Sequence, residues 1–303
     1  MPQICVLGEA LMDCVPQPNG DLRPVIGGSP FNFARAAALR GARVAYVSPL
    51  STDLFGDAMR AQFAKEQVQV LSPPSRAPTS LAVVQLKDGQ PSYSFYREGV
   101  ADRDYESAQL LAVLSQHKPA VLHTGSLALV PPEHEKVITI LKAAKALGWT
   151  ISVDVNLRPQ MVSNLGEYLA AVKTIAALAD WLKASDEDLA LLGFAAATRA
   201  DAPRIAQHFT VQGISRLALT FGASGAWLLV DGKTAEQDVP PVTVIDTVGA
   251  GDTFWGNCVA DWAMQPTGAA QRVETTLSQA MRAAAINCSR AGCQPPRFDE
   301  LTV

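Results

Sequence analysis

The chain has 303 residues, of which 48% are hydrophobic and 18% are charged, and its 25 basic and 29 acidic residues leave a formal net charge of −4. That length suits one large α/β domain or two smaller ones, with enough apolar side chains for a buried core. The slight acidity and the lack of a basic cluster argue against a nucleic-acid partner or an anionic membrane held by charge.

The cysteines and the N-terminal segment indicate a compartment. The five cysteines are odd in number and scattered, with no Cys-x-x-Cys pair, which argues against a disulfide framework or a zinc site; they are Cys5, Cys14, Cys258, Cys288 and Cys293. Glu9 and Asp13 interrupt the first apolar stretch, so we do not expect a signal peptide. No apolar run approaches membrane-spanning length. We therefore expect a cytoplasmic protein.

Short apolar, β-branched runs alternate with amphipathic stretches along the chain. The runs typical of strands are Ile4–Leu7, Val44–Val47, Val121–His123, Ile151–Val155, Trp181–Ala184 and Leu217–Thr220. The stretches with helical periodicity are Phe31–Arg40, Asp57–Gln67, Glu133–Leu147, Glu167–Leu178, Pro203–Gln212 and Val273–Ser289. This alternation predicts an α/β fold: a mostly parallel sheet with helices on both faces, whose ligands bind beyond the carboxyl ends of the strands.

One region departs from this alternation. Two strand-like runs, Thr79–Leu86 and Pro91–Arg97, are joined around Asp88-Gly89, which is a strong hairpin signal, and Cys14–Ile26 looks extended. Asp231-Gly232 is a further hairpin signal. We interpret the first three pieces as a small β-sheet that serves as a lid, formed by about residues 13–26 and 79–103 of a single domain spanning 1–303. A surface insertion without a role is the alternative.

The segment Asp246-Thr-Val-Gly-Ala-Gly-Asp252-Thr-Phe254 is the most informative one. It follows a β-type run, Val242–Ile245, and opens a helix-like stretch that starts at Asp252. Its small residues let the backbone approach a ligand, and a helix start offers N–H groups and a positive dipole end to an anion. A carboxylate repels phosphate, so Asp252 fits this place if it takes a proton from a second substrate. A capping aspartate is the alternative.

This segment resembles the second signature of the ribokinase-type (PfkB) carbohydrate kinases, and Gly27-Gly28-Ser-Pro-Phe-Asn32 resembles their first. With intermediate motifs, the resemblance extends from Gly8 to about Gly292. The blend of motifs is most similar to that of bacterial fructokinases. The resemblance implies a ribokinase-like, doubly wound fold with a β-sheet lid, and phosphoryl transfer from Mg-ATP to a sugar hydroxyl.

The resemblance also implies catalytic roles. Asp252 would accept the proton of a primary sugar hydroxyl. The backbone N–H groups of Gly249, Ala250 and Gly251 would stabilise the phosphoryl group together with Arg158, whose guanidinium can pair with two oxygens. Arg158 follows a predicted strand, and strand alternation would point Asp154, Asn156 and Arg158 to the same side.

Sugar hydroxyls need hydrogen-bond donors and acceptors. The residues expected to supply them, together with Asp252, are Asp13, Gly27, Gly28, Asn32, Tyr96 and Arg97. Ordinary roles compete with this hypothesis. Ser29 as N-cap with Pro30 at the first helical position would make a plain helix start, Asp13 would be a solvated loop acid, and Arg97 an exposed strand residue.

The nucleotide is expected at the strand exits and the helix start, against Asn156, Lys183, Ser185, Thr220, Gly222, Gly225, Gly249, Gly251 and Asn287. Where the family has Asn-x-x-Glu to organise Mg²⁺ through water, this chain has Ser185 and Asp188, so Asp188 or its neighbour Glu187 is the candidate. A capped helix start explains those acids equally, and a glycine turn explains Gly222 and Gly225. Asp246 and the Val248 carbonyl are candidates for K⁺, although Asp246 is also explained as structural.

The predicted function is an ATP-dependent sugar kinase. Ser94-Phe-Tyr-Arg-Glu-Gly99, with Ala101-Asp-Arg103, favours fructose as the acceptor. Ribose, a nucleoside or 2-keto-3-deoxygluconate are alternatives, and Arg97 and Arg103 leave the acidic acceptor open. A sugar- or nucleotide-binding regulator without turnover is a second alternative. Nucleic-acid and membrane partners are not expected, whereas the edges of the lid could pair two copies into a homodimer.

Overall fold

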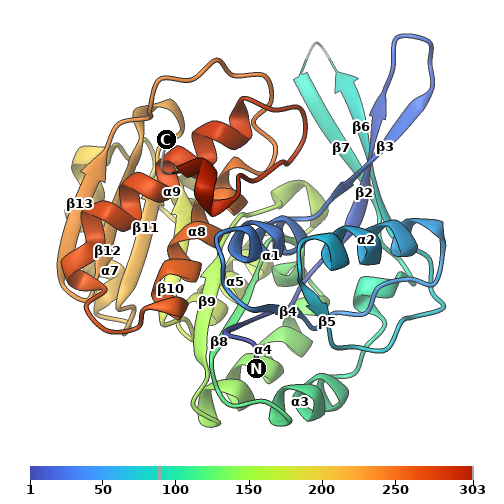
Figure 1. Ribbon diagram of the computed structural model, residues 1–303, viewed down its shortest axis with the longest axis horizontal. Helices are drawn as coiled ribbons and strands as arrows, with labels where there is room; N and C mark the ends of the chain where they lie inside the picture. The colour runs from blue at the N-terminus through green and yellow to red at the C-terminus, as the bar shows by residue number, and fades with distance from the viewer. Residues whose placement is uncertain (88–89, 302–303) are drawn as a thin grey trace.

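The computed structural model describes residues 1–87 and 90–301, and it shows a large sheet covered by helices with a smaller sheet projecting beside it (Figure 1). The large sheet has the order β13-β12-β11-β10-β9-β8-β1-β4-β5. Its strands are β1 Ile4–Val6, β4 Val44–Tyr46, β5 Gln69–Val70, β8 Val121–Gly125, β9 Thr150–Asp154, β10 Trp181–Ser185, β11 Arg216–Thr220, β12 Ala226–Val230 and β13 Lys233–Gln237. From β5 to β11 neighbouring strands are parallel, and β12 and β13 are antiparallel to their neighbours.

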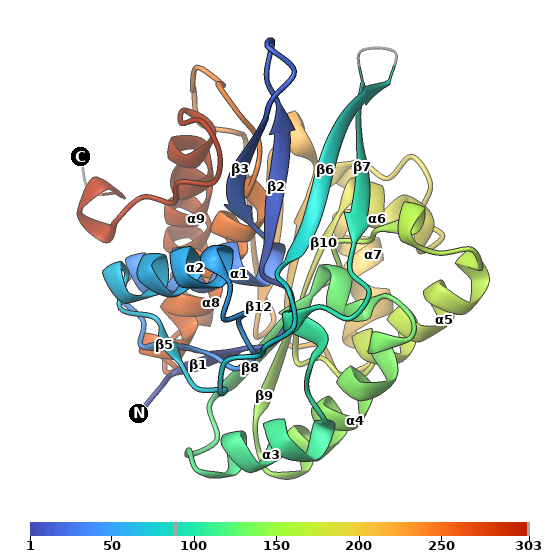
Figure 2. The same cartoon turned by 90° about the vertical axis from the view of Figure 1, so that its right-hand side faces the viewer.

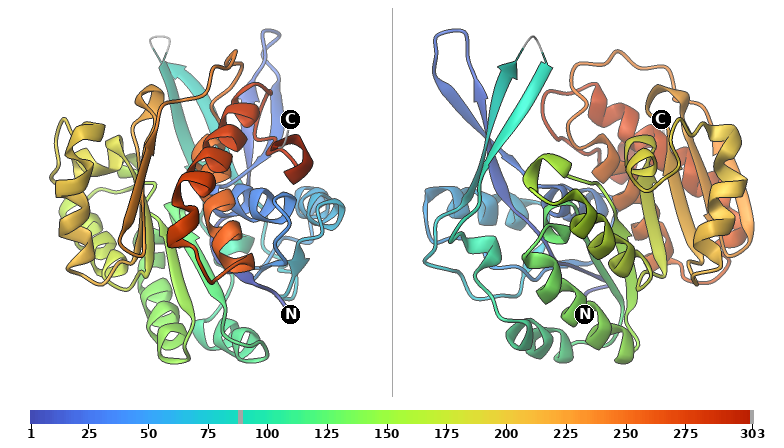
Figure 3. Two further views of the ribbon diagram at one scale, coloured as in Figure 1. Left: turned by 60° about the vertical axis from the view of Figure 1, so that its left-hand side comes forward. Right: turned by 180° about the vertical axis from the view of Figure 1, so that it is seen from behind.

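Helices cover both faces of this sheet (Figure 2 and Figure 3). One face packs against α3 Ser107–Ser115, α4 Glu133–Ala146, α5 Leu165–Ala176, α6 Asp186–Leu191 and α7 Ala202–Thr210. The other packs against α1 Ser29–Leu39, α2 Leu54–Lys65, α8 Ala250–Met264 and α9 Val273–Cys288. The predicted doubly wound α/β fold is therefore confirmed. None of the helices in the described parts of the chain is long and apolar enough to cross a membrane.

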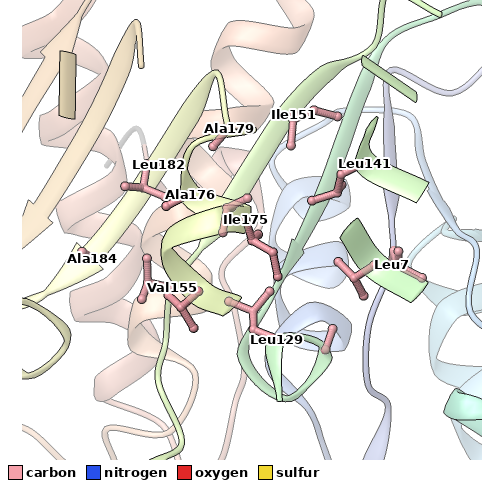
Figure 4. Packing of buried hydrophobic residues seen from close by; sticks show 14 of the residues in the cluster. Leu7, Leu129, Leu141, Ile151, Val155, Ile175, Ala176, Ala179, Leu182 and Ala184 are labelled. Atoms are coloured by element: carbon pink, nitrogen blue, oxygen red, sulfur yellow. The ribbon is translucent and has the colours of Figure 1, made fainter. Parts of the chain in front are cut away.

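The two faces are set by the alternation of side chains along the strands. In β1, Ile4 and Val6 pack on the α1 side, whereas Cys5 packs on the opposite side with Leu7, the residue after the strand. Figure 4 shows part of the hydrophobic core on the face covered by α3 to α7, where Leu7 and Ile151 of the sheet region lie near Leu141 of α4 and Ile175 of α5. A strand buried on both faces reads as a continuous apolar run, which is why these strands could be predicted.

The small sheet has the order β3-β2-β6-β7. Its strands are β2 Leu11–Pro16, β3 Leu22–Gly27, β6 Ser80–Lys87 and β7 Gln90–Tyr96. The antiparallel pairing of β6 with β7 agrees with the predicted hairpin, whose Asp88-Gly89 lies outside the described residues. The second hairpin prediction is confirmed, because Asp231 and Gly232, both with positive φ, join β12 to β13.

Besides the two-residue strand β5, which was not predicted, two elements differ from prediction. Val242–Ile245 is not a strand: Val244 and Ile245 are exposed, and the Ile245 N–H donates to the Cys288 carbonyl instead of to a neighbouring strand. Helix α3 was not predicted, because only Leu110 and Leu114 of its nine residues are buried and so its apolar stripe is short.

Strand β1 lies where the direction of winding reverses. The next strand of the large sheet, β4, lies on one side of β1, while β8 and its successors lie on the other. In a doubly wound sheet this reversal leaves a crevice at the carboxyl ends of the two central strands. The fold therefore predicts a ligand site beyond Val6 of β1 and Gly125 of β8.

Candidate active site

A cleft of about 500 Å³, called the central cleft here, lies at this reversal. Its walls are formed by the segments after β1, β8, β9 and β10, by the starts of α1 and α8, and by β2 and β7 of the small sheet. The lining residues are Glu9, Leu11, Asp13, Gly28, Ser29, Asn32, Phe95, Ser126, Leu127, Asn156, Leu157, Arg158, Pro159, Gln160, Ser185, Glu187, Asp188, Leu191, Val248, Gly249 and Asp252.

The start of α8 forms one wall. Gly249 has φ 74° and precedes the first helical residue, Ala250. A Cβ at Gly249 would lie 2.2 Å from Cys293 Sγ, so only glycine fits this turn. Because the helix begins at Ala250, Asp252 lies within its first turn and is not the capping residue. The predicted helix start was two residues late, and the capping explanation of Asp252 is wrong.

Asp252 is held by two side chains of α1. Ser29 Oγ donates to Asp252 Oδ1 at 2.7 Å, and Asn32 Nδ2 donates to Oδ2 at 3.1 Å. Burial raises the pKa of Asp252, while these donors and the cations Lys183 and Arg158 act in the opposite direction. A raised pKa makes the carboxylate a better proton acceptor, as a general base requires.

Ser29 is not the N-cap of α1 that the alternative interpretation predicted. The N-cap of α1 is Gly28, with φ 104° and no room for a side chain, since a Cβ would lie 2.6 Å from the Glu9 carbonyl oxygen. Ser29 is thus the first helical residue, and the N-cap prediction is wrong. Its hydroxyl accepts from Asn156 Nδ2 at 2.9 Å, and Asn156 Oδ1 accepts from Arg158 Nη1 at 2.6 Å.

Asp154 does not point to the same side as Asn156 and Arg158. Strand β9 ends at Asp154, and Asn156 has φ 38°, so strand alternation does not continue. Asn156 and Arg158 line the central cleft, whereas Asp154 is buried and accepts from Lys183 Nζ at 2.9 and 3.0 Å. Burial raises the pKa of Asp154 to about 6, against the effect of Lys183. Lys183 lies beneath the start of α8, since a Cβ at Gly251 would be 3.2 Å from its Nζ.

The cleft contains polar atoms that need partners. Glu9 Oε2, Asn32 Oδ1 and Ser126 Oγ are buried and have no hydrogen-bond partner among the described residues. Glu9 was not predicted as a site residue. Its Oε1 accepts from the Ser29 N–H at 3.2 Å, and burial raises the pKa of Glu9 to about 7. The available signal was an acid three positions after a buried strand. Such unpaired acceptors suit a ligand that brings hydroxyl donors.

Asp13 enters the cleft from β2. Burial raises its pKa to about 6, with Arg158 opposing this rise and Asp252 adding to it. A Cβ at Gly27 would lie 2.1 Å from Asp13 Oδ2, so Gly27 provides the space for the carboxylate. Asp13 is therefore not a solvated loop acid.

Tyr96 and Arg97 lie outside the central cleft. They line a second cleft beside Glu98, Arg103 and Glu133. Tyr96 is 60% exposed, whereas Arg97 is buried and forms an ion pair with Asp102. The alternative of an exposed strand arginine is therefore wrong, and the structure does not bring Tyr96 and Arg97 into the central cleft with the sugar ligands predicted there.

Ser185 caps α6, as the capped-helix interpretation predicted. The Asp188 N–H donates to Ser185 Oγ, while Asp188 Oδ2 accepts from the Ser185 N–H and hydroxyl, and Oδ1 from the Leu157 N–H. Glu187 is exposed at the cleft. The described residues contain no group of three or more His, Cys, Asp or Glu side chains that could hold a metal.

The predicted nucleotide residues after β11 also lie outside the central cleft. Thr220 ends β11, and Gly222 has φ 51° with open space at its missing side chain. A Cβ at Gly225 would lie 2.1 Å from the Gln237 carbonyl oxygen. Strand packing alone therefore accounts for Gly225.

Asn287 joins the loop before α8 to the C-terminal segment. Asn287 Nδ2 donates to the Val248 carbonyl at 2.8 Å, and its Oδ1 accepts from the Gln294 N–H. Asp246 connects the same two segments, because its two oxygens accept from the N–H groups of Val248 and Gly292. The structural interpretation of Asp246 thus has a physical basis.

An acid in the first turn of a helix, facing an acceptor-lined cleft at the reversal of a doubly wound sheet, is the arrangement of an α/β protein that binds a small polar molecule. The sequence model of the pfkB family of carbohydrate kinases matches residues 1–300, so the chain belongs to this family. It is therefore a phosphotransferase that acts on an alcohol group.

Relatives extend over nearly the whole chain. A fructokinase of Rhizobium leguminosarum bv. trifolii is 31% identical over 287 residues, which are 92% of this chain and 85% of the relative. A crystal structure of fructokinase from Xylella fastidiosa with bound ATP is 28% identical, with a TM-score of 0.83 and coverage of 99% and 97%. Fructokinase from Vibrio cholerae O395 in a fructose, ADP and calcium ion bound form is 25% identical, with a TM-score of 0.84 and coverage of 99% and 98%.

Proposed function

We propose that this protein is an ATP-dependent fructokinase. The observation that carries the proposal is the pairing of Asp252, in the first turn of α8, with the unpartnered acceptors of the central cleft. A polyol supplies the hydroxyl donors that those acceptors lack, and one of its hydroxyls can face Asp252. The likeness to fructokinases that bind ATP or fructose with ADP supports the same substrates.

The chemistry needs a base, an anion site and a dry cleft. Asp252 takes the proton of a primary hydroxyl, whose oxygen forms a bond to the γ-phosphorus of ATP as the bond to ADP breaks. The N–H groups of Gly249, Ala250 and Gly251 and the Arg158 guanidinium stabilise the charge on the transferred group. Asp13, Gly28 and Asn32 hold the sugar.

The charges in the cleft favour a neutral acceptor. Among the described lining residues Arg158 is the cation, facing Glu9, Asp13 and Asp252. Arg97 is already paired with Asp102, and Arg103 with Glu133. A carboxylated acceptor such as 2-keto-3-deoxygluconate would thus meet acids in the cleft, where Arg158, the one cation among the described lining residues, is assigned to the phosphoryl group, so fructose is the better candidate than an acidic sugar.

Glu187 fits Mg²⁺ better than Asp188 does. Glu187 projects from an exposed position at the cleft, whereas both Asp188 oxygens already accept backbone donors. Bound Mg²⁺ would neutralise nucleotide phosphate charge, with Glu187 orienting its water shell. For K⁺, the Asp246 carboxylate and the Val248 carbonyl each accept one or more N–H donors already, so these oxygens have less to offer a cation.

The small sheet is proposed as the lid. Leu11 and Asp13 of β2 and Phe95 of β7 reach the central cleft, so a movement of this sheet would change access to it. Closure would exclude water, which competes with the sugar for the phosphoryl group.

All five cysteines are free thiols, which suits the proposed cytoplasmic location.

The test is turnover of Mg-ATP with fructose, ribose, 2-keto-3-deoxygluconate, adenosine and glucose, with Asp252→Asn beside the wild type. We expect fructose to be preferred, and kcat of the variant to fall by about 10²–10⁴ because the base is lost. Turnover of another acceptor would support the kinase activity and contradict the proposal that fructose is the substrate. Binding of sugar and ATP by the wild type without turnover would instead indicate a regulator. This is the second candidate because both oxygens of Asp188 accept backbone N–H groups and so have less to offer Mg²⁺.

A further inference from the structure

The side chains of four residues, from the segment after β9 and from α1 and α8, form a hydrogen-bonded chain that ends at Asp252. Arg158 donates to Asn156, Asn156 donates to Ser29, and Ser29 donates to Asp252, with donor–acceptor distances of 2.6, 2.9 and 2.7 Å. Ser29 is buried, with 8% of its surface exposed. We propose that Ser29 is a positioning residue, which orients the proposed base Asp252 and favours its ionised form. This inference rests on the proposed function.

Arg158, the first donor, fixes the direction of this hydrogen-bonded chain. An arginine side chain has only donors, so Asn156 must turn its carbonyl oxygen to Arg158 and its amide nitrogen to Ser29. Ser29 Oγ therefore receives a hydrogen atom from Asn156, and its own proton points to Asp252 Oδ1. A hydroxyl that could rotate freely would have no such preference. The fixed proton stabilises a carboxylate and not a carboxylic acid.

The backbone of Ser29 is held as firmly as its hydroxyl. Its N–H donates to Glu9 Oε1 at 3.2 Å, and it is the first residue of α1 after Gly28. Asn32, one turn further along α1, donates to the other oxygen of Asp252. The carboxylate is therefore clamped by two donors from one rigid helix, while its remaining lone pairs can meet a substrate hydroxyl.

Other charges act on Asp252 as well, and the test has to separate them from Ser29. Lys183 and Arg158 favour the ionised form, whereas Asp13 and Asp154 oppose it, and Cys293 faces the same carboxylate. Replacing Ser29 by alanine removes none of these charged groups, but it removes both hydrogen bonds of the hydroxyl, the one to Asp252 and the one from Asn156. A change that follows this substitution thus reports the loss of the hydroxyl and of both its hydrogen bonds.

The experiment measures kcat/KM for fructose against pH in the wild type and in Ser29→Ala. Loss of a hydrogen bond to a charged group should lower kcat/KM by about tenfold on the acidic side and much less on the alkaline side, because Asp252 ionises at higher pH without its donor. Ser29→Thr, which restores a hydroxyl, should recover part of the acidic rate. A uniform loss at every pH would overturn the proposal.

A second readout does not depend on turnover. The carboxyl of Asp252 is titrated in the ligand-free protein by difference infrared spectroscopy, with Asp252→Asn identifying its band. Ser72→Ala is the matched control, since Ser72 is 7% exposed, donates to the Val47 carbonyl and is not part of this chain. Its titration should equal that of the wild type. Ser29→Ala should titrate at higher pH, and an unchanged titration would overturn the inference even if the wild type proves inactive towards fructose.

Discussion

Glu9 carries a carboxyl group in surroundings that disfavour its charge. It is 1% exposed, and burial is the main cause that raises its pKa to about 7, with Arg97 acting against the rise. The ordinary value is 4.5. Between these two pH values the folded protein keeps a proton on Glu9 that the unfolded chain releases, so the contribution of Glu9 to the free energy of unfolding falls as the pH rises through this window.

Glu9→Gln should remove that dependence. Glutamine keeps an oxygen for the Ser29 N–H but cannot ionise, so wild type and variant should be similarly stable near pH 4.5 and diverge up to pH 7, the variant becoming more stable by an amount of the order of 3 kcal/mol. Urea unfolding at a series of pH values measures the difference. Glu98→Gln, at an exposed glutamate, should show no such divergence. A constant difference between Glu9→Gln and wild type would contradict the raised pKa.

At this scale the sequence identified residues whose partners are local. Asp252 and Gly249 could be located because the small residues and the helix start are contiguous. Ser29 was misread as a cap because its partner, Asp252, is 223 positions away. Arg97 was expected at the sugar because nothing in its neighbourhood shows that Asp102, five positions on, would be buried against it.

Helices α1 and α8 approach each other closely, and this contact places Asp252 beside Ser29 and Asn32. Gly256 of α8 lies at the contact, where a Cβ would be 2.9 Å from Ala36 Cβ and 3.0 Å from the Phe33 carbonyl oxygen. Backbone atoms cannot move aside as a flexible side chain can. The spacing of the two helices thus depends on the absence of a side chain at this position.

Gly256→Ala should therefore separate the helices. We expect a loss of about 1–3 kcal/mol of stability, despite the better helix propensity of alanine, and a lower kcat because the hydrogen bonds to Asp252 lengthen. Thermal unfolding and fructose turnover measure both effects. The matched control is Gly166→Ala in α5, where the nearest atom would be Asn164 Oδ1 at 3.5 Å. Equal behaviour of the two variants would exclude close packing as the cause.

Elements could be predicted where burial imposes a period. The central strands of the large sheet are apolar on both sides, unlike the edge strands β5 and β13, and the long helices carry a clear apolar stripe. Val242–Ile245 has the composition of a strand but lacks a strand partner, and composition cannot reveal whether a partner exists. The end of β9 was misjudged for a similar reason, because the backbone of Asn156 turns to a positive φ that only the surrounding structure enforces.

The small sheet gives the whole molecule two open edges, β3 and β7. Leu22 of β3 is 50% exposed and Tyr96 of β7 is 60% exposed. Open edges and exposed apolar side chains favour association with a second copy. The homodimer expected from the sequence therefore remains a prediction that can be tested at this sheet.

Light scattering after size exclusion should find a dimer, and Leu22→Lys should increase the monomer fraction, because a buried charge opposes pairing. Leu147→Lys is the control, since Leu147 is 53% exposed at the end of α4 and lies outside the small sheet. A wild-type monomer at all concentrations would contradict the prediction. Equal effects of the two variants would place the interface elsewhere.

The separation of Ser29 and Asp252 by 223 positions has a consequence for how the protein is made. Synthesis proceeds from the N-terminus, so β1 and α1 leave the ribosome long before α8 exists. Until then, the apolar side chains of α1 that later contact α8 are uncovered, and transiently exposed apolar surface of this kind favours aggregation. The proposed base lies in α8, so a chain that terminates before Asp252 lacks it however much of the preceding chain has been made.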